Sequence, residues 1–168
     1  MIPIIITIIS LLLDGMITNY LPYLVNNLSP LTPLLTITSL VVIYPFYKKK
    51  IKTYYVLAFF LGLLYDLMYT NLFLTNSAIF LILSIIIKNI YKNFNTNGFR
   101  ILLYITFIIC IYELILAGAF LLLNIVPVTF QALSYKIINS LLLNLLYGQL
   151  LYNIIRLLPR KYTNLKIN

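Results

Sequence analysis

The sequence predicts an all-α membrane protein, a six-transmembrane-helix bundle with cytoplasmic N and C termini. Three observations support this fold class. Of the 168 residues, 62% are hydrophobic and only 9% are charged, whereas about half of a soluble domain is apolar and about a quarter is charged. The apolar residues form six runs near the length of a membrane span. The basic residues gather between alternate runs, as the positive-inside rule expects.

The first expected span covers residues 2–24 and ends before the polar run 26–30. The second covers residues 32–47, which is short for a helix that needs about 20 residues to cross a bilayer. The second span ends at a cluster of lysines: Lys48, Lys49, Lys50 and Lys52.

The third expected span covers residues 53–70, and the fourth covers 74–91. Only a few uncharged residues connect them, which indicates a tight connection. The break after the fourth span contains Asn97-Gly98, a dipeptide typical of turns.

The fifth expected span covers residues 101–126, and the sixth covers 135–158 before a short basic tail. The polar connections are all too short to form a soluble domain. The chain is therefore expected to be a single transmembrane domain over residues 1–168.

The basic residues predict how the spans are oriented. All of them except Lys136 lie in the tail, around the end of the fourth span or after the second span. Cytoplasmic loops carry an excess of Lys and Arg, so both termini are expected inside the cell. The main clusters, which are expected to anchor this topology and to attract anionic lipid or a cytoplasmic partner, are Lys48, Lys49, Lys50, Lys52, Arg156, Arg160 and Lys161. Tyr54 and Tyr91 lie at predicted inner span ends, where interfacial aromatic residues are expected.

The only acidic residues, Asp14, Asp66 and Glu113, lie in the first, third and fifth spans. Each lies about twelve or thirteen residues from the predicted cytoplasmic start of its span, or about 18 to 20 Å along a helix. The three acids are therefore expected to share one layer, slightly outward of the bilayer centre. An ionisable group at such a depth costs about 2.5 to 3.5 kcal/mol, so it is expected to face the bundle interior.

Small and polar residues extend this candidate site. Ala58, Gly62 and Asp66 recur at every fourth position of the third span, a face to which another helix can approach closely. Asn144 lies on a polar stripe of the sixth span at about the depth of the acids. We expect these residues, with Asp14 and Glu113, to be buried polar groups or contacts for a partner helix.

Three interpretations of the acids remain open at this stage. They are protonated groups that hydrogen-bond the helices together, contacts for a partner transmembrane helix, or part of a proton or ion relay. The chain has no histidine, which excludes His-based triads and rhomboid-type proteases. Tyr65-Asp66 superficially matches an intramembrane aspartyl protease signature, but the second Asp lacks its Gly-x-Gly-Asp context. We expect no enzyme activity, no metal or other cofactor, and no nucleic-acid partner.

Residues 60–70, with the sequence FLGLLYDLMYT, resemble the best-marked stretch of the bacterial rod shape-determining protein MreD family, a Gly-Leu-x-x-Asp run in a middle helix. The resemblance extends over most of the chain, from Leu13-Asp14-Gly15 through Pro33-Leu34-Leu35 to Asn139 and Tyr147. It adds Asn139 to the candidate contact residues and supports Gly62 and Asp66.

The resemblance implies a non-enzymatic, multi-pass scaffold in the bacterial cytoplasmic (inner) membrane. Such a scaffold of the cell-elongation machinery would hold MreC and link MreB filaments to peptidoglycan synthesis by RodA and a class B penicillin-binding protein. A fold similar to the substrate-binding subunit of energy-coupling-factor transporters is also implied. The alternative function is therefore that of such a vitamin-binding subunit, although the short connection after the third span leaves little room for a lid over a vitamin.

Overall fold

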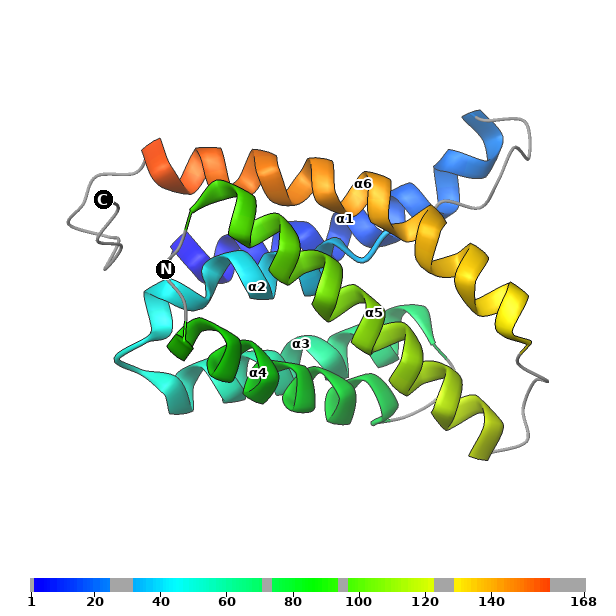
Figure 1. Cartoon of the computed structure of the whole chain (residues 1–168), viewed down its shortest axis with the longest axis horizontal. Helices are drawn as coiled ribbons and strands as arrows, with labels where there is room; N and C mark the ends of the chain where they lie inside the picture. Colours follow the sequence, from blue (N-terminus) through cyan, green and yellow to red (C-terminus); the bar gives the residue numbers. More distant parts are fainter. Residues whose placement is uncertain (1, 25–31, 71–73, 94–96, 123–128, 158–168) are drawn as a thin grey trace.

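Every element of the computed structural model is an α-helix in the part of the chain that it describes, residues 2–24, 32–70, 74–93, 97–122 and 129–157 (Figure 1). The helices are α1 Ile2–Leu24, α2 Leu35–Tyr47, α3 Ile51–Tyr69, α4 Thr75–Asn93, α5 Gly98–Leu122 and α6 Phe130–Leu157. Four of them, α1, α3, α5 and α6, contain stretches long and apolar enough to cross a membrane. The predicted all-helical fold with six helices is confirmed.

Local chemistry explains where the observed helix starts differ from the expected ones. α2 begins at Leu35 and not at residue 32, because a residue before proline, here Thr32 before Pro33, is held away from helical geometry. α6 begins at Phe130, five residues earlier than expected. The Thr129 hydroxyl accepts a hydrogen bond from the Ala132 N–H at 3.3 Å and so caps this helix.

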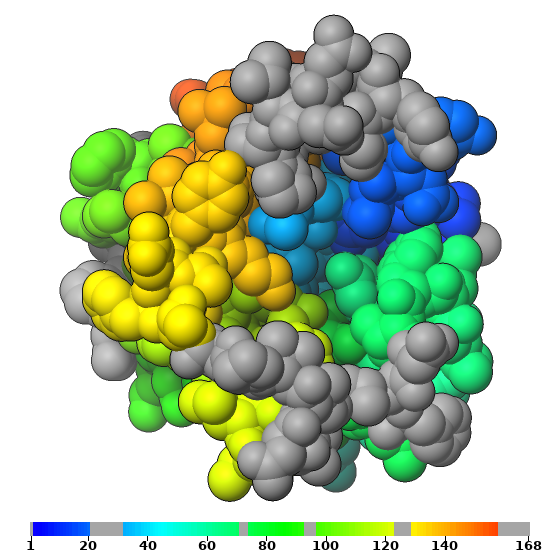
Figure 2. Space-filling model, turned by 90° about the vertical axis from the view of Figure 1, so that its right-hand side faces the viewer, coloured from blue at the N-terminus to red at the C-terminus, as the bar shows by residue number. Residues whose placement is uncertain are grey.

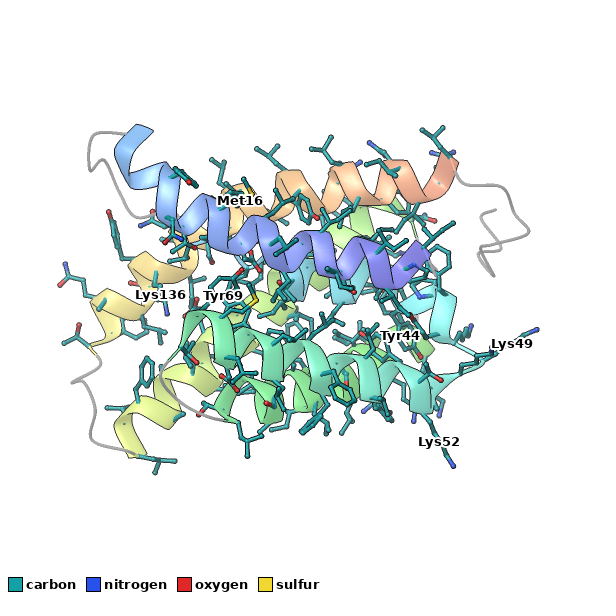
Figure 3. All side chains as sticks on the ribbon, turned by 180° about the vertical axis from the view of Figure 1, so that it is seen from behind. Met16, Tyr44, Lys49, Lys52, Tyr69 and Lys136 are labelled. Atoms are coloured by element: carbon teal, nitrogen blue, oxygen red, sulfur yellow. The ribbon has the colours of Figure 1, made fainter. Side chains whose placement is uncertain are left out.

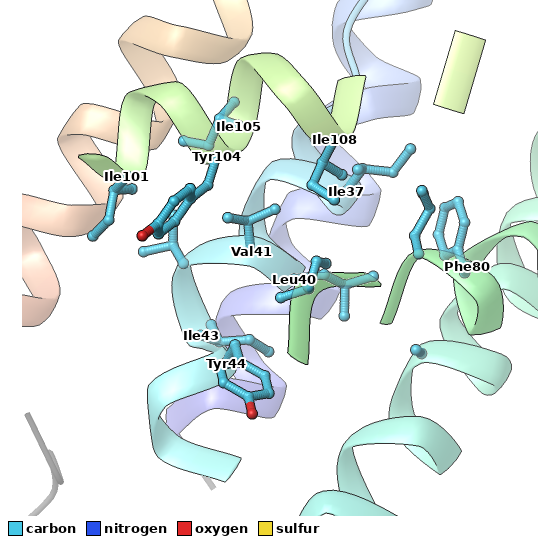
Figure 4. Close-up of a cluster of buried hydrophobic side chains, with 14 of the residues drawn as sticks. Ile37, Leu40, Val41, Ile43, Tyr44, Phe80, Ile101, Tyr104, Ile105 and Ile108 are labelled. Atoms are coloured by element: carbon cyan, nitrogen blue, oxygen red, sulfur yellow. The ribbon is translucent and has the colours of Figure 1, made fainter. Parts of the chain in front are cut away.

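α2 is the centre of the bundle. It has only 13 residues, about 20 Å of helix, which is too short to cross the hydrocarbon core alone. All of its residues except Phe46 are buried, and it contacts each of the other five helices. Figure 4 shows Ile37, Leu40 and Val41 of this helix packed among residues of α4 and α5. A helix that is apolar on every side is buried in a protein core or in lipid, and here other helices surround it.

The two ends of the bundle differ in charge. Lys49 and Lys52 project from one end, and Lys136 lies at the other (Figure 3). We call the first of these the basic end; its described bases are Lys48, Lys49, Lys50, Lys52, Lys88, Lys92, Arg100 and Arg156.

A proline inside α2 explains one of two hydrogen bonds that buried tyrosines make to this helix near the basic end. Pro45 has no N–H, so the carbonyl of Val41, four residues earlier, loses its helical donor. The Tyr91 hydroxyl donates to that carbonyl at 2.9 Å, and the Tyr54 hydroxyl donates to the carbonyl of Leu40 at 3.0 Å. Both side chains are buried against α2, and their position at the level of the membrane interface stays a prediction.

Replacing Tyr91 by phenylalanine should destabilise the protein by about 1 to 2 kcal/mol, because the Val41 carbonyl would be left buried without a donor. In a Pro45→Ala background the new N–H of residue 45 can donate to Val41, so the same change should cost less. Equilibrium unfolding in mixed detergent micelles measures all four variants of this cycle. Equal costs of Tyr91→Phe in the two backgrounds would show that the hydroxyl does not compensate for the proline.

Candidate functional site

Asp14 of α1 binds the beginning of α2. Its Oδ1 accepts the N–H of Leu35 at 2.7 Å, while its Oδ2 accepts the N–H of Thr36 at 2.9 Å and the Thr36 hydroxyl at 2.5 Å. The first N–H groups of a helix have no acceptor within the helix and carry a partial positive charge. All three groups donate, which matches an ionised carboxylate. Asp14 therefore caps α2 from a neighbouring helix.

Asn144 of α6 completes the same junction. Its Oδ1 accepts the N–H of Leu34 at 2.9 Å, and its Nδ2 donates to the carbonyls of Ser140 at 2.6 Å and Thr32 at 3.3 Å. Residues 32–34 are not helical. Non-helical backbone at membrane depth is stable only where protein groups satisfy its hydrogen bonds, and Asn144 supplies two of them.

Asp66 of α3 repeats this arrangement at α4. Its Oδ1 accepts the N–H and the Nδ2 of Asn76 at 3.1 and 2.8 Å and the Thr70 hydroxyl at 3.0 Å. Its Oδ2 accepts the N–H and the hydroxyl of Ser77, each at 3.2 Å. The Tyr112 hydroxyl donates to Asn76 Oδ1 at 3.0 Å, which extends the network to α5. In two successive helix pairs, an aspartate on the first helix thus caps the second.

Gly62 allows α4 to come this close. A Cβ built on Gly62 would lie 2.6 Å from the Asn76 carbonyl oxygen and 2.6 Å from the Ser77 Cα. Ala58, one turn earlier, is also fully buried. The small face of α3 at Gly62 was expected to be a candidate contact for a partner helix, but α4 of the same chain covers it.

Glu113 of α5 is held differently from the two aspartates. Its side chain is 2% exposed, and its Oε2 pairs with Lys136 Nζ of α6 at 2.9 Å. Its Oε1 is buried and has no hydrogen-bond partner among the described residues, and the same is true of the Nδ2 of the partly buried Asn139. α6 begins six residues before Lys136, so Glu113 does not bind the start of that helix. The Lys136 ammonium binds Glu113 instead, whereas N–H groups at helix starts bind Asp14 and Asp66. Within the part of the chain that the structure describes, the third acid therefore keeps one acceptor without a donor.

Beyond this ion pair, the end of α5 and the start of α6 are not buried. Glu113 is the last buried residue of α5, and Ser140 is the first of α6. Residues 114–122 and 130–139 therefore contain no fully buried side chain. A Cβ on Gly118 would meet nothing within 4 Å. Figure 2 looks onto this end of the molecule, where the start of α6 (yellow) and the end of α5 (yellow-green) lie at the rim.

The remaining predicted residues lie away from this layer. Lys48, Lys49, Lys50, Lys52 and Arg156 are exposed at the basic end. Arg160 and Lys161 lie outside the described residues.

The groups that the acids bind are not evident from the spacing of the acids in the sequence. Thr36, Asn76 and Ser77 are polar residues in the first turns of buried helices, and that pattern was a usable signal because such residues cluster at helix starts. The backbone N–H groups that accompany them leave no trace in the sequence.

These features define a class: an all-helical integral membrane protein in which buried carboxylates join successive helices. The family model of rod shape-determining protein MreD matches residues 1–162, nearly the whole chain. The chain belongs to this family, whose members are non-enzymatic membrane proteins of the bacterial inner membrane that determine rod cell shape. No curated protein matches the chain, and no solved structure does, so the expected likeness to the energy-coupling-factor subunit fold has no structural match.

Proposed function

We propose that this protein is a scaffold of the cell-elongation machinery that holds MreC in the membrane. Through MreC it would connect MreB filaments to RodA and a class B penicillin-binding protein. Family membership supports the role in cell shape. The positive-inside rule supports an orientation with the basic end, and both termini, in the cytoplasm.

The observation that carries this proposal is the buried Glu113 Oε1, which has no hydrogen-bond partner among the described residues. A buried acceptor without a donor costs about 1 to 3 kcal/mol, more when it is charged. A transmembrane helix that brings a donor to Glu113 Oε1 removes this cost. Lys136 is 40% exposed, so its side chain is the part of the pair that can move aside.

The surface beside Glu113 suits a helix partner. Leu114 and Gly118 lie one turn apart on α5; Leu114 is exposed, and Gly118 has open space around it. Small residues let helix backbones approach closely in a membrane, where packing and hydrogen bonds drive association. We assign this surface to the membrane helix of MreC.

Site-specific photo-crosslinking tests the assignment. A photoreactive residue at Leu114 or Gly118 should form an adduct with co-expressed MreC. The same residue at Phe60 or Leu64, a pair with the same spacing on the exposed face of α3, should not. Adducts from α3 alone would place MreC on another surface.

A substitution gives a second measure of MreC binding. Gly118→Leu should lower co-purification of MreC severalfold while leaving the yield of folded protein unchanged, because Gly118 has no near neighbours. Undiminished recovery of MreC would contradict the proposed surface. Gly62→Leu is unsuitable for this test, because it would disrupt the packing of α3 on α4.

A further inference from the structure

The basic end lacks acidic side chains of its own. The chain has only three acidic residues, and all three are committed to the contacts of Asp14, Asp66 and Glu113 described above. No Asp or Glu side chain of this protein therefore neutralises the lysines at the basic end. Solvent ions or an anionic molecule can supply their counter-charge.

Three of these lysines gather where α3 begins and α4 ends. Lys52 precedes Tyr55 by one turn on α3, and Lys92 follows Lys88 by one turn on α4. Lys88 Nζ lies 6.0 Å from the centre of the Tyr55 ring and so connects the two helices. The helices run antiparallel, with Gly62 against Ser77, which brings the start of α3 beside the end of α4. Lys52 and Lys92 are exposed, and Lys88 is half-buried.

This group resembles a headgroup site more than a simple topology anchor. The ammonium of Lys88 lies near an aromatic face, which restrains it by a cation–π attraction. The long apolar stem of a lysine can lie against apolar surface while its charge extends toward the headgroups. Lys88 and Lys92 are like charges four residues apart, an unfavourable pair until an anion lies between them. Basic pockets between transmembrane helices are a known type of site for anionic lipid headgroups.

We propose that Lys52, Lys88 and Lys92, together with Tyr55, bind the phosphate headgroup of an anionic phospholipid. The ligand is a lipid of the leaflet at the basic end, held at the junction of α3 and α4. This site is separate from the α5–α6 surface assigned to MreC, so either proposal can fail without the other.

Native mass spectrometry of the purified full-length protein tests this site. The protein is mixed with phosphatidylglycerol or with phosphatidylcholine of the same acyl chains, and the bound lipid is counted. Wild type should retain phosphatidylglycerol in preference to phosphatidylcholine. Lys52→Gln/Lys88→Gln should lower retention of phosphatidylglycerol about tenfold, since each lysine at a membrane surface adds to the attraction.

The α2–α3 turn supplies a charge-matched control. Lys49→Gln/Lys50→Gln removes the same charge from exposed residues of the same end but leaves the α3–α4 group intact, so it should retain most of the lipid. Equal losses in the two double variants would show a diffuse charge effect and overturn the site. An absence of preference for phosphatidylglycerol in wild type would do the same, as would displacement of the lipid by equimolar inorganic phosphate.

Discussion

Replacing Gly62 by alanine should strongly destabilise the protein. Among the glycines in the described part of the chain, this is the one where an added Cβ would meet backbone atoms. The new Cβ would lie 2.6 Å from two backbone atoms of α4, the Asn76 carbonyl oxygen and the Ser77 Cα. Backbone cannot rotate away as a flexible side chain can, so α4 must shift as a unit. Overpacking of this kind costs about 3 kcal/mol, and the shift would also lengthen the hydrogen bonds to Asp66. We expect a large loss of unfolding free energy in detergent micelles.

The same substitution at Gly118 is the matched control. Gly118 is also a helical glycine, but a Cβ there meets nothing within 4 Å. Gly118→Ala should therefore be neutral or slightly stabilising, because alanine favours the helix by about 1 kcal/mol over glycine. If the two alanine variants unfold at the same detergent concentration, the close approach of α3 and α4 at Gly62 is not what limits stability.

Hydropathy predicted the existence of the helices but not their arrangement. Lipid tails are as apolar as a protein core, so a run of Ile, Leu and Val has the same pattern facing lipid or facing protein. The short helix α2 is the clearest case, because its sequence suggested a short span and the structure places it at the centre of the bundle. Its length was the one available signal, since 13 residues do not cross a bilayer.

The polar layer was predictable in position but not in chemistry. The cost of an ionisable group within the membrane predicted that Asp14, Asp66 and Glu113 face the bundle interior, and all three are buried. Their partners are backbone N–H groups for the two aspartates and an ammonium for Glu113. Which helix begins beside each acid depends on the tertiary arrangement. Small residues had the same ambiguity, because the sequence does not show which helix covers Gly62, and α4 of the same chain does so.

The difference between the acids leads to a second large expected effect. Asp66→Asn should lower the free energy of unfolding by about 3 kcal/mol or more. An asparagine side chain replaces one acceptor oxygen with an NH₂ group, yet Asp66 accepts five hydrogen bonds, from Thr70, Asn76 and Ser77. At least one buried donor would face another donor, and bonds to a charged acceptor contribute about 1.5 to 3 kcal/mol each.

Glu113→Gln is the isosteric comparison in the same layer. Only one oxygen of Glu113 has a described partner, and the Lys136 side chain is 40% exposed, so its ammonium can move away from residue 113 when the charge is lost. The expected cost is about 1 kcal/mol, because a partly exposed ion pair contributes little. Unfolding followed by circular dichroism suits both variants, since the chain has no tryptophan. If Glu113→Gln were as costly as Asp66→Asn, Glu113 Oε1 would already be satisfied within the chain. Glu113 Oε1 would then not be free to accept from a partner helix. A small cost in stability together with a loss of MreC recovery would show that Glu113 serves MreC binding more than folding.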